Sequence, residues 1–207
     1  MNKICLFGAS GHGKVVKDVA HSINILIEAF IDDCPKDNFL DEIPIFKFQE
    51  IYKYENNRFI ICIGNNDFRK KIAKKITSKY AKLVHPTSIV SSTVNISEGT
   101  VVMPGVTINA DTKIGKHVIV NTGAVVEHDC VIADFVHISP NATITGNVSI
   151  GEGSHIGAGS IIIPNITIGK WVTIGAGAVI TKNVPDYAVV VGVPGRVIKY
   201  NKNNYEK

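Results

Sequence analysis

The 207-residue sequence predicts a small α/β domain over residues 1–83 and an all-β parallel β-helix with a C-terminal cap over residues 84–207. The first observation behind this prediction is a strand, a glycine-rich loop and a helical pattern at the start of the chain. The second is a six-residue repeat that begins at Val84. The third is composition: residues 84–184 hold 12 of the 18 glycines but only 10 of the 40 charged residues, unlike a helical or doubly wound segment.

The N-terminal part alternates short apolar runs with helical patterns. Helix-spaced apolar residues follow the first run, and a second helical pattern follows the third run as far as Tyr80. This order predicts a small Rossmann-like unit with a parallel sheet. The expected strands are Lys3–Phe7, Glu28–Ile31 and Arg58–Ile63.

The glycine-rich loop Gly8–Gly13 is suited to holding a phosphate group. Glycine lets the backbone approach a ligand, and the N-terminus of the following helix presents free N–H groups. The spacing is G-x-x-G-x-G rather than the dinucleotide pattern G-x-G-x-x-G, which disfavours NAD. Asp32 and Asp33 end the second strand, where folds of this type hold a ribose or a base.

Charge and cysteine content exclude several classes. The net charge of +4 is too small to indicate a nucleic-acid-binding protein, and we interpret the basic residues between Arg69 and Lys82 as the solvated face of a helix. No apolar run reaches the roughly 18 residues that span a membrane, and the N-terminus does not resemble a signal peptide. The four cysteines form no C-x-x-C pair, so a reduced, cytoplasmic protein is expected.

The repeat defines the second domain. Every sixth residue from Val84 to Ile180 is Val or Ile, at seventeen successive positions, and a small or β-branched residue follows four positions after each. β-branched residues favour extended backbone, and Gly or Asn at the corners permits positive φ. Three units close a triangular turn of about 18 residues, so the repeat predicts a solenoid of about five to six turns without an interruption. Glycine also recurs between these positions, at Gly115, Gly151, Gly157, Gly169 and Gly175.

These features resemble the hexapeptide-repeat acyltransferases, and among them the NeuD/PglD family of sugar acetyltransferases. Beyond the repeat, the glycine loop and the Asp pair, the resemblance rests on Ile63–Asn66, Glu127–Asp129 and Val191–Gly195, and it covers nearly the whole chain. It implies a left-handed β-helix, acetyl-CoA as the co-substrate, and a homotrimer with its active site between subunits. The family includes UDP-4-amino-sugar N-acetyltransferases, GDP-sugar enzymes and sialic acid O-acetyltransferases.

By the same resemblance, the N-terminal domain binds the sugar nucleotide. A tight turn with a solvated Asp pair is the alternative interpretation, in which His12 is only a turn residue. The residues expected to contact the substrate are Ser10, Gly11, His12, Asp32, Asp33 and Gly64.

The triplet from Glu127 to Asp129 is the candidate catalytic group. It stands between the inward-facing Val126 and Cys130, so His128 is expected near a face or corner. Acetyl transfer to an amine or hydroxyl needs a base, and imidazole titrates near neutral pH. The resemblance implies that His128 is this base and Asp129 its acidic partner, with Glu127 as the other candidate partner and a plain surface imidazole as the alternative.

The resemblance also implies that His137 contacts acetyl-CoA near the thioester. Gly146, Ala158 and Ala176 are candidates for the pantetheine groove, and a purely packing role is their alternative. His155 lies 18 residues after His137, so the two rings should stack, and we favour a structural role for His155.

The predicted function is acetyl-CoA-dependent N-acetylation of the 4-amino group of a UDP-linked amino-dideoxysugar for bacterial glycans. The alternatives are O-acetylation of sialic acid or another sugar, and a sugar-nucleotide-binding scaffold without turnover. No metal is expected, because the histidines show no His-x4-His pairing. Cys130 is expected to face inward as inert packing, which predicts direct transfer without an acyl-enzyme.

Overall fold

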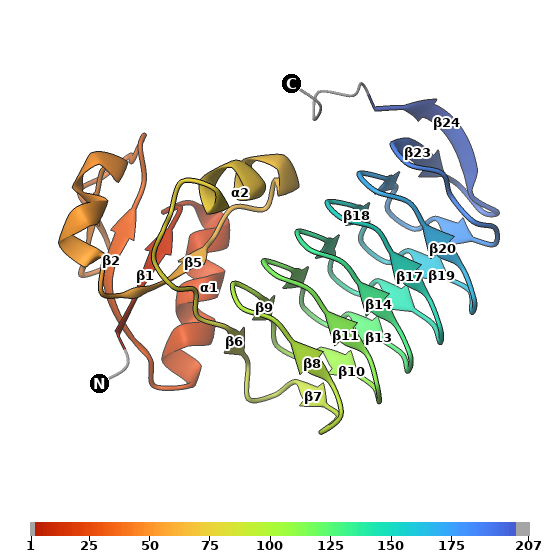
Figure 1. Cartoon of the computed structure of the whole chain (residues 1–207), viewed down its shortest axis with the longest axis horizontal. Coiled ribbons are helices and arrows are strands. Elements are labelled where there is room, and N and C mark those ends of the chain that lie inside the picture. The colour runs from red at the N-terminus through yellow and green to blue at the C-terminus, as the bar shows by residue number, and fades with distance from the viewer. Residues whose placement is uncertain (1–2, 202–207) are drawn as a thin grey trace.

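The computed structural model describes residues 3–201 and shows two domains side by side (Figure 1). An α/β domain packs against the first turns of a parallel β-helix, which extends away from it to a C-terminal hairpin. The predicted boundary between residues 83 and 84 falls inside β6 (Leu83–Val84), the first strand of the β-helix.

The N-terminal domain contains a five-stranded sheet in the order β3-β4-β2-β1-β5. Strands β4, β2, β1 and β5 are parallel to one another, and β3 is antiparallel to β4. The central strands are apolar on both faces, as expected for parallel strands that are covered on both sides. The strands are β1 (Lys3–Phe7), β2 (Leu26–Ile31), β3 (Phe39–Leu40), β4 (Ile43–Phe46) and β5 (Arg58–Ile61), and the helices are α1 (Gly11–Ser22), the 3-10 helix η1 (Phe48–Tyr54) and α2 (Asn66–Ala73).

Two features of this domain were not predicted. The hairpin β3–β4 and η1 are too short to carry a clear periodic pattern. The helical pattern expected to reach Tyr80 is wrong beyond Ala73, where α2 ends. Tyr80 instead forms a parallel bridge with Phe59, so this segment runs beside β5.

Three parallel sheets form the walls of the β-helix, and each turn contributes a two-residue strand to each wall. Pairs such as Thr107 with Val125 confirm the predicted turn of 18 residues. The β6 wall contains β6, β9 (Val101–Val102), β12 (Ile119–Val120), β15 (His137–Ile138), β18 (His155–Ile156), β21 (Thr173–Ile174), β23 (Ala188–Val191) and β24 (Arg196–Tyr200). The β7 wall contains β7 (Ile89–Val90), β10 (Thr107–Ile108), β13 (Val125–Val126), β16 (Thr143–Ile144), β19 (Ile161–Ile162) and β22 (Val179–Ile180), and the β8 wall contains β8 (Asn95–Ile96), β11 (Lys113–Ile114), β14 (Val131–Ile132), β17 (Ser149–Ile150) and β20 (Thr167–Ile168).

The repeat residues fill the interior of this prism. From Val102 to Ile180, the Val or Ile at every sixth position is at most 2% exposed. Burying one such side chain stabilises a fold by about 1.5–3 kcal/mol, so the stacked rows form a continuous apolar core. Each turn therefore depends on its neighbours for burial, as the repeat predicts.

Positive φ recurs at one corner position in every unit, fourteen times in succession. Gly and Asn adopt this conformation readily, whereas Phe135 and Trp171 do so rarely and are held by stacking against the preceding turn. The glycines singled out between the repeat positions have a different role. At Gly151, for example, a Cβ would lie 2.6 Å from the carbonyl carbon of Gly169, so close approach of successive turns requires glycine there. The positive-φ corners are Gly99, Gly105, Asp111, His117, Gly123, Asp129, Phe135, Asn141, Asn147, Gly153, Gly159, Asn165, Trp171 and Gly177.

Candidate active site

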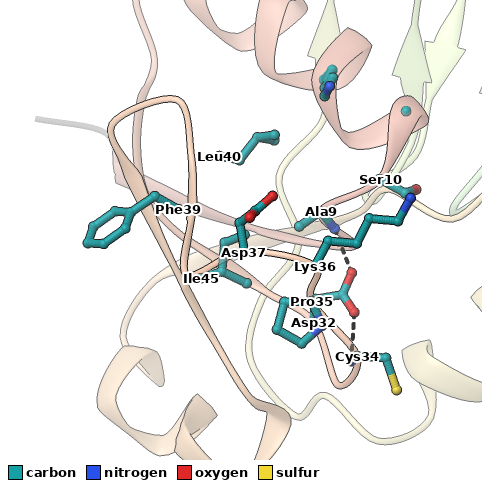
Figure 2. A pocket seen from close by; sticks show the side chains of 12 residues that line it. Ala9, Ser10, Asp32, Cys34, Pro35, Lys36, Asp37, Phe39, Leu40 and Ile45 are labelled. Atoms are coloured by element: carbon teal, nitrogen blue, oxygen red, sulfur yellow. Dashed lines mark hydrogen bonds between the residues drawn. The ribbon is translucent and has the colours of Figure 1, made fainter.

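A pocket of about 260 Å³ opens where β1 and β2 end. Asp32 lies at its centre: Oδ2 accepts a hydrogen bond from the Ala9 amide at 2.8 Å, and Oδ1 accepts one from the Cys34 amide at 3.0 Å (Figure 2). Lys14 and Lys36 add positive charge. The apolar lining comes from the loop after β2 and from β3–β4, through Pro35, Phe39, Leu40 and Ile45.

The glycine loop shapes the floor of this pocket. Gly8 has φ +108°, and a Cβ on Gly13 would collide with the Gly8 carbonyl oxygen, so both positions require glycine. Gly11 has no neighbouring atom within 4 Å of the place of a Cβ, so a ligand can approach its backbone closely. The first turn of α1 carries no acidic residue, which leaves its N–H groups and positive dipole end available to an anion such as a diphosphate.

The structure divides the predicted substrate residues into two groups. Ser10, Gly11 and Asp32 line the pocket. Asp33 lies beside it, and its Oδ1 accepts a hydrogen bond from the Phe48 amide at 3.0 Å, which anchors η1. His12 and Gly64 lie elsewhere, at the joint between the domains, where both contact His137.

His128 and Asp129 form a hydrogen-bonded pair at the corner between the β7 and β8 walls. His128 Nδ1 lies 2.8 Å from Asp129 Oδ2, so the neutral ring carries its proton on Nδ1 and leaves the Nε2 lone pair free. The Asp129 hydrogen bond raises the pKa of His128 above its usual value, and Glu127 adds a smaller electrostatic effect. Asp129 therefore orients the ring, although both side chains are 59% exposed within one chain.

Gly146 lies directly against the His128 ring, one turn further along the β-helix. A Cβ at this position would lie 2.7 Å from His128 Cε1 and 2.8 Å from Nε2. The absence of a side chain at position 146 thus gives the imidazole its place. Sequence reasoning assigned Gly146 to the cofactor groove, whereas its nearest neighbour in the structure is the candidate base.

His137 is held on the β6 wall by partners on both ring nitrogens. Asn121 Oδ1 accepts a hydrogen bond from the Thr122 amide at 2.8 Å, so its Nδ2 faces His137 Nε2, 3.1 Å away. Nε2 must therefore be the acceptor, and Nδ1–H donates to the Gly64 carbonyl at 3.3 Å. Asn121 was not predicted to belong to the site, since an Asn at a solenoid corner is expected on conformational grounds alone.

Further imidazoles lie next to His137. The His155 ring stacks on it with centroids 4.9 Å apart, which confirms the predicted stacking, and His12 lies 6.5 Å away on the other domain. Burial lowers the pKa of His137 to about 3 and that of His12 to about 4, with smaller effects from the positive charge of Arg69. The group is therefore neutral at pH 7, in contrast to His128.

Arg69 is the charged residue at the centre of the domain joint. We interpreted it from the sequence as part of a solvated helix face, and this interpretation is wrong for Arg69, which is 1% exposed. Its guanidinium donates to the His117 carbonyl at 2.8 Å and to the Phe135 carbonyl at 2.8 Å on the β-helix. Lysine and arginine follow the same polar pattern in a sequence, so periodicity alone does not distinguish a buried guanidinium from an exposed one.

The two halves of the candidate site lie on different sides of the prism. His128 and Gly146 occupy the corner between the β7 and β8 walls, whereas His137 lies on the opposite β6 wall. Ala158 and Ala176 are exposed at a third place, the corner between the β6 and β7 walls. The predicted cofactor residues therefore do not form one line on a single chain.

Other predicted features have structural explanations. Cys130 is fully buried, and burial raises the pKa of its thiol, as expected of a packing residue. Within residues 3–201, no three His, Cys, Asp or Glu side chains are grouped so that they could hold a metal ion. In the same range, no helix has the length and apolarity to cross a membrane.

The buried histidines predict a loss of stability in acid. Their folded-state pKa values lie below the usual value of about 6.5, so the unfolded chain binds more protons as the pH falls below 6.5. We expect the free energy of unfolding to fall between pH 6.5 and 4 by up to about 1.4 kcal/mol per pH unit for each neutral histidine. Urea unfolding at a series of pH values measures this slope, which should decrease in His137→Asn and stay unchanged in the exposed-site control His21→Asn. A urea midpoint that is constant from pH 7 to 5 would contradict the prediction.

Comparison with known proteins places these features in a family. The model of the PglD N-terminal domain matches residues 3–76, and the six-repeat bacterial transferase hexapeptide model matches residues 111–146, 129–163 and 147–182. A mutant perosamine N-acetyltransferase from Caulobacter crescentus, solved with CoA and GDP-perosamine, superimposes with a TM-score of 0.92 at 32% identity, covering 96% of this chain and 98% of that chain. The acetyltransferase domain of PglB from Neisseria gonorrhoeae, solved with acetyl coenzyme A, has a TM-score of 0.90 at 36% identity and covers 95% and 99%.

A curated relative extends the comparison. UDP-N-acetylbacillosamine N-acetyltransferase from Bacillus subtilis is 38% identical over 112 residues, which are 50% of this chain and 52% of the relative, so the match spans about half of that protein's length. The fold and the exposed His–Asp pair define the class as an acyltransferase of the hexapeptide-repeat type. The chain belongs to the PglD-like family of sugar acetyltransferases. Family, two-domain fold and acetyl-CoA as the family's acetyl donor are thereby confirmed as predicted.

Proposed function

We propose that this protein transfers the acetyl group of acetyl-CoA to the 4-amino group of a UDP-linked amino-dideoxysugar. The observation that carries the proposal is the His128–Asp129 pair, which leaves one ring nitrogen free to accept a proton. The similar enzymes support an amino group as the acceptor, because those named for their substrates are N-acetyltransferases of bacillosamine and perosamine.

The proposed reaction is a direct transfer. The sugar amine attacks the thioester carbonyl carbon while His128 Nε2 takes a proton from the nitrogen. The C–S bond then breaks, the imidazolium returns its proton to the sulfur, and CoA leaves as a thiol. Asp129 keeps the Nδ1–H tautomer and stabilises the imidazolium. Cys130, the nearest thiol in the chain, is buried beneath this corner and takes no part.

The pocket at Asp32 is the proposed nucleotide site. The start of α1 and Lys14 suit a diphosphate, and the apolar lining from the loop after β2 and from β3–β4 suits a base. UDP is proposed rather than GDP because the UDP-sugar relative is 38% identical over its matched region, compared with 32% for the GDP-perosamine enzyme.

We propose that the complete site forms between copies of the chain, in a homotrimer. Within one chain, His128 is exposed and lies on the opposite side of the prism from the wall that bears His137 and the substrate domain. A base that works in a water-excluded site needs a cover, and a second copy can supply it.

The β7 wall is the surface best suited to this contact. Its outward-facing residues are all uncharged and β-branched, whereas the β8 wall presents Asn95, Lys113 and Ser149. Packing three β7 walls around one axis places the His128 corner of one chain beside the corner of the next chain that carries Asn121, Ala158 and Ala176. The outward residues of the β7 wall are Ile89, Thr107, Val125, Thr143, Ile161 and Val179.

A thiol-release assay tests the proposed function. Acetyl-CoA is offered with UDP-4-amino-sugars, UDP-GlcNAc, GDP-perosamine and sialic acid, and the UDP-4-amino-sugars should release CoA fastest. Faster turnover of GDP-perosamine would overturn the choice of nucleotide, and turnover of sialic acid would favour O-acetylation. No release with any acceptor would favour the scaffold alternative. A cytoplasmic location stays part of the proposal, supported by four cysteines that are all free.

The raised pKa of His128 predicts the acid limb of the pH–rate profile. The base must be deprotonated to accept a proton, so activity should fall as the pH decreases through a pKa above the usual value of about 6.5. In Asp129→Asn the hydrogen bond that raises this pKa is lost, and the acid limb should move to lower pH while the maximal rate falls. Steady-state rates from pH 5 to 9 measure both effects. An acid limb that stays in place would assign the orienting role to another group, such as Glu127.

Cys34 provides a direct probe of nucleotide binding. It is exposed and lines the pocket, whereas Cys5, Cys62 and Cys130 are buried, with pKa values raised by burial. A bound nucleotide should therefore slow alkylation of Cys34, by about tenfold at ten times its dissociation constant. Mass spectrometry after iodoacetamide treatment with UDP or GDP measures this protection, and Cys34→Ser shows the background. Equal alkylation rates with and without either nucleotide would argue against this pocket.

A further inference from the structure

We propose that Arg69 is a positioning residue of the acetyl-transfer site, which fixes the His137 ring from the far side of the domain joint. This inference rests on the function proposed above, in which His137 contacts acetyl-CoA. Arg69 lies in α2 and touches none of the proposed reacting groups, so it acts through His137.

The guanidinium holds both sides of the His137 contact. Nη1 donates to the Gly64 carbonyl at 3.2 Å, and this carbonyl is the acceptor for His137 Nδ1–H. Nη2 donates to the carbonyl of Phe135 at 2.8 Å and approaches that of Val136 at 3.4 Å, the two residues that lead into the strand of His137. The acceptor of the ring and the backbone that carries the ring are thus tied to one rigid group.

The remaining donors of Arg69 show why arginine is required. Nε donates to the His117 carbonyl at 2.8 Å, Nη1 also donates to the Ile63 carbonyl at 2.9 Å, and Nη2 also donates to Asn66 Oδ1 at 2.9 Å. These acceptors come from both domains and are all uncharged. A planar fork with five N–H groups can serve them together, whereas the single ammonium of lysine cannot.

Arg69 also supplies a fixed positive charge beside the imidazoles. Burial lowers its pKa to about 9, so it keeps its charge at neutral pH. The groups facing it are His12 of α1 and His117, His137 and His155 of the β-helix, and no carboxylate hydrogen-bonds to it among the described residues. The charge opposes protonation of these rings, so His137 retains the tautomer whose Nε2 can accept a hydrogen bond from an N–H of the pantetheine arm.

Lys70 offers a matched control at the same joint. Its ammonium pairs with Glu152 and lies 5.2 Å from the centre of the Trp171 ring, so it ties α2 to the β-helix without a bond to Gly64 or His137. If Arg69 served only to join the domains, loss of either residue would have the same kind of effect. A role through His137 instead predicts different effects.

A double-mutant cycle tests the proposal. In otherwise wild-type protein, Arg69→Lys should lower kcat/KM for acetyl-CoA by about tenfold, whereas in a His137→Ala background it should change it by less than about twofold. Lys70→Met should lower the melting temperature without changing kcat/KM. An equal loss in both backgrounds, or the same loss in Lys70→Met, would overturn the proposal. If Arg69→Lys does not fold, Arg69→Gln takes its place in the cycle.

A spectroscopic measurement separates this inference from the proposed function. In protein with ¹⁵N-labelled histidine, the His137 ring should be in the Nδ1–H form in the wild type and in a mixture of tautomers in Arg69→Lys. This readout does not depend on turnover. If no acceptor is acetylated but the tautomer shifts, the proposed function fails and the link between Arg69 and His137 stands; an unchanged tautomer would refute the link itself.

Discussion

Replacing His128 with Ala is expected to lower kcat for acetyl transfer by about 10²–10⁴-fold, the contribution of a positioned general base. Without the ring, no group at this corner can take the proton of the attacking amine. Because His128 is exposed, its removal should leave the melting temperature nearly unchanged. Thiol release and thermal unfolding measure the two quantities, and His21→Ala, at an exposed position of α1, is the control. A variant that releases CoA at the parental rate would show that His128 is not the base.

A second variant separates the presence of the ring from its position. Gly146→Ala keeps His128 but places a methyl group where the ring now lies. The side chain can rotate away at little cost, so kcat should fall while stability changes little. Unchanged activity in Gly146→Ala would mean that the precise place of the imidazole does not matter to the reaction.

Mixing two inactive variants is expected to restore activity. The proposed site takes His128 from one chain and the nucleotide pocket from the next, so a trimer that combines His128→Ala with Asp32→Ala contains some interfaces with both groups intact. If the chains assemble at random in equal amounts, about one quarter of the sites should be intact, because each half has an even chance of being wild type. Thiol release after joint unfolding and reassembly measures the recovered activity.

Two controls make this result decisive. Each variant reassembled alone should stay inactive, and the two proteins mixed without unfolding should recover activity only as fast as subunits exchange. If jointly reassembled trimers stay inactive although both variants form mixed assemblies, the site lies within one chain. Such a result would contradict the arrangement proposed for the β7 walls.

The solenoid was predictable because its physical cause is local. The Val/Ile period of six determines which side chain faces the interior, and a residue on each wall pairs with the residue 18 positions later. The stacking of His137 on His155 follows from the same arithmetic. The His128–Asp129 contact joins neighbours in sequence, so its chemistry was also accessible.

Contacts between the domains were not accessible in this way. His12 was expected to contact the nucleotide because it follows the glycine loop, yet it faces the β-helix. Arg69 and Asn121 were missed because their partners lie far away in the chain, at Phe135 and His137. Nothing local marks a residue whose role depends on how two domains dock. The division of the active site between chains was expected from family resemblance, and the wall assignments supply a physical reason for it.

The 18-residue turn also constrains how such a chain can change in length. A deletion of 18 residues between two strands of one wall removes a whole turn and leaves every remaining side chain above the same neighbours as before. A deletion of six residues would rotate everything after it by one wall, which would move the later residues out of line with those on earlier turns. Viable insertions and deletions in this half of the protein are therefore quantised, and the gap between lineages should be counted in complete storeys rather than in single residues.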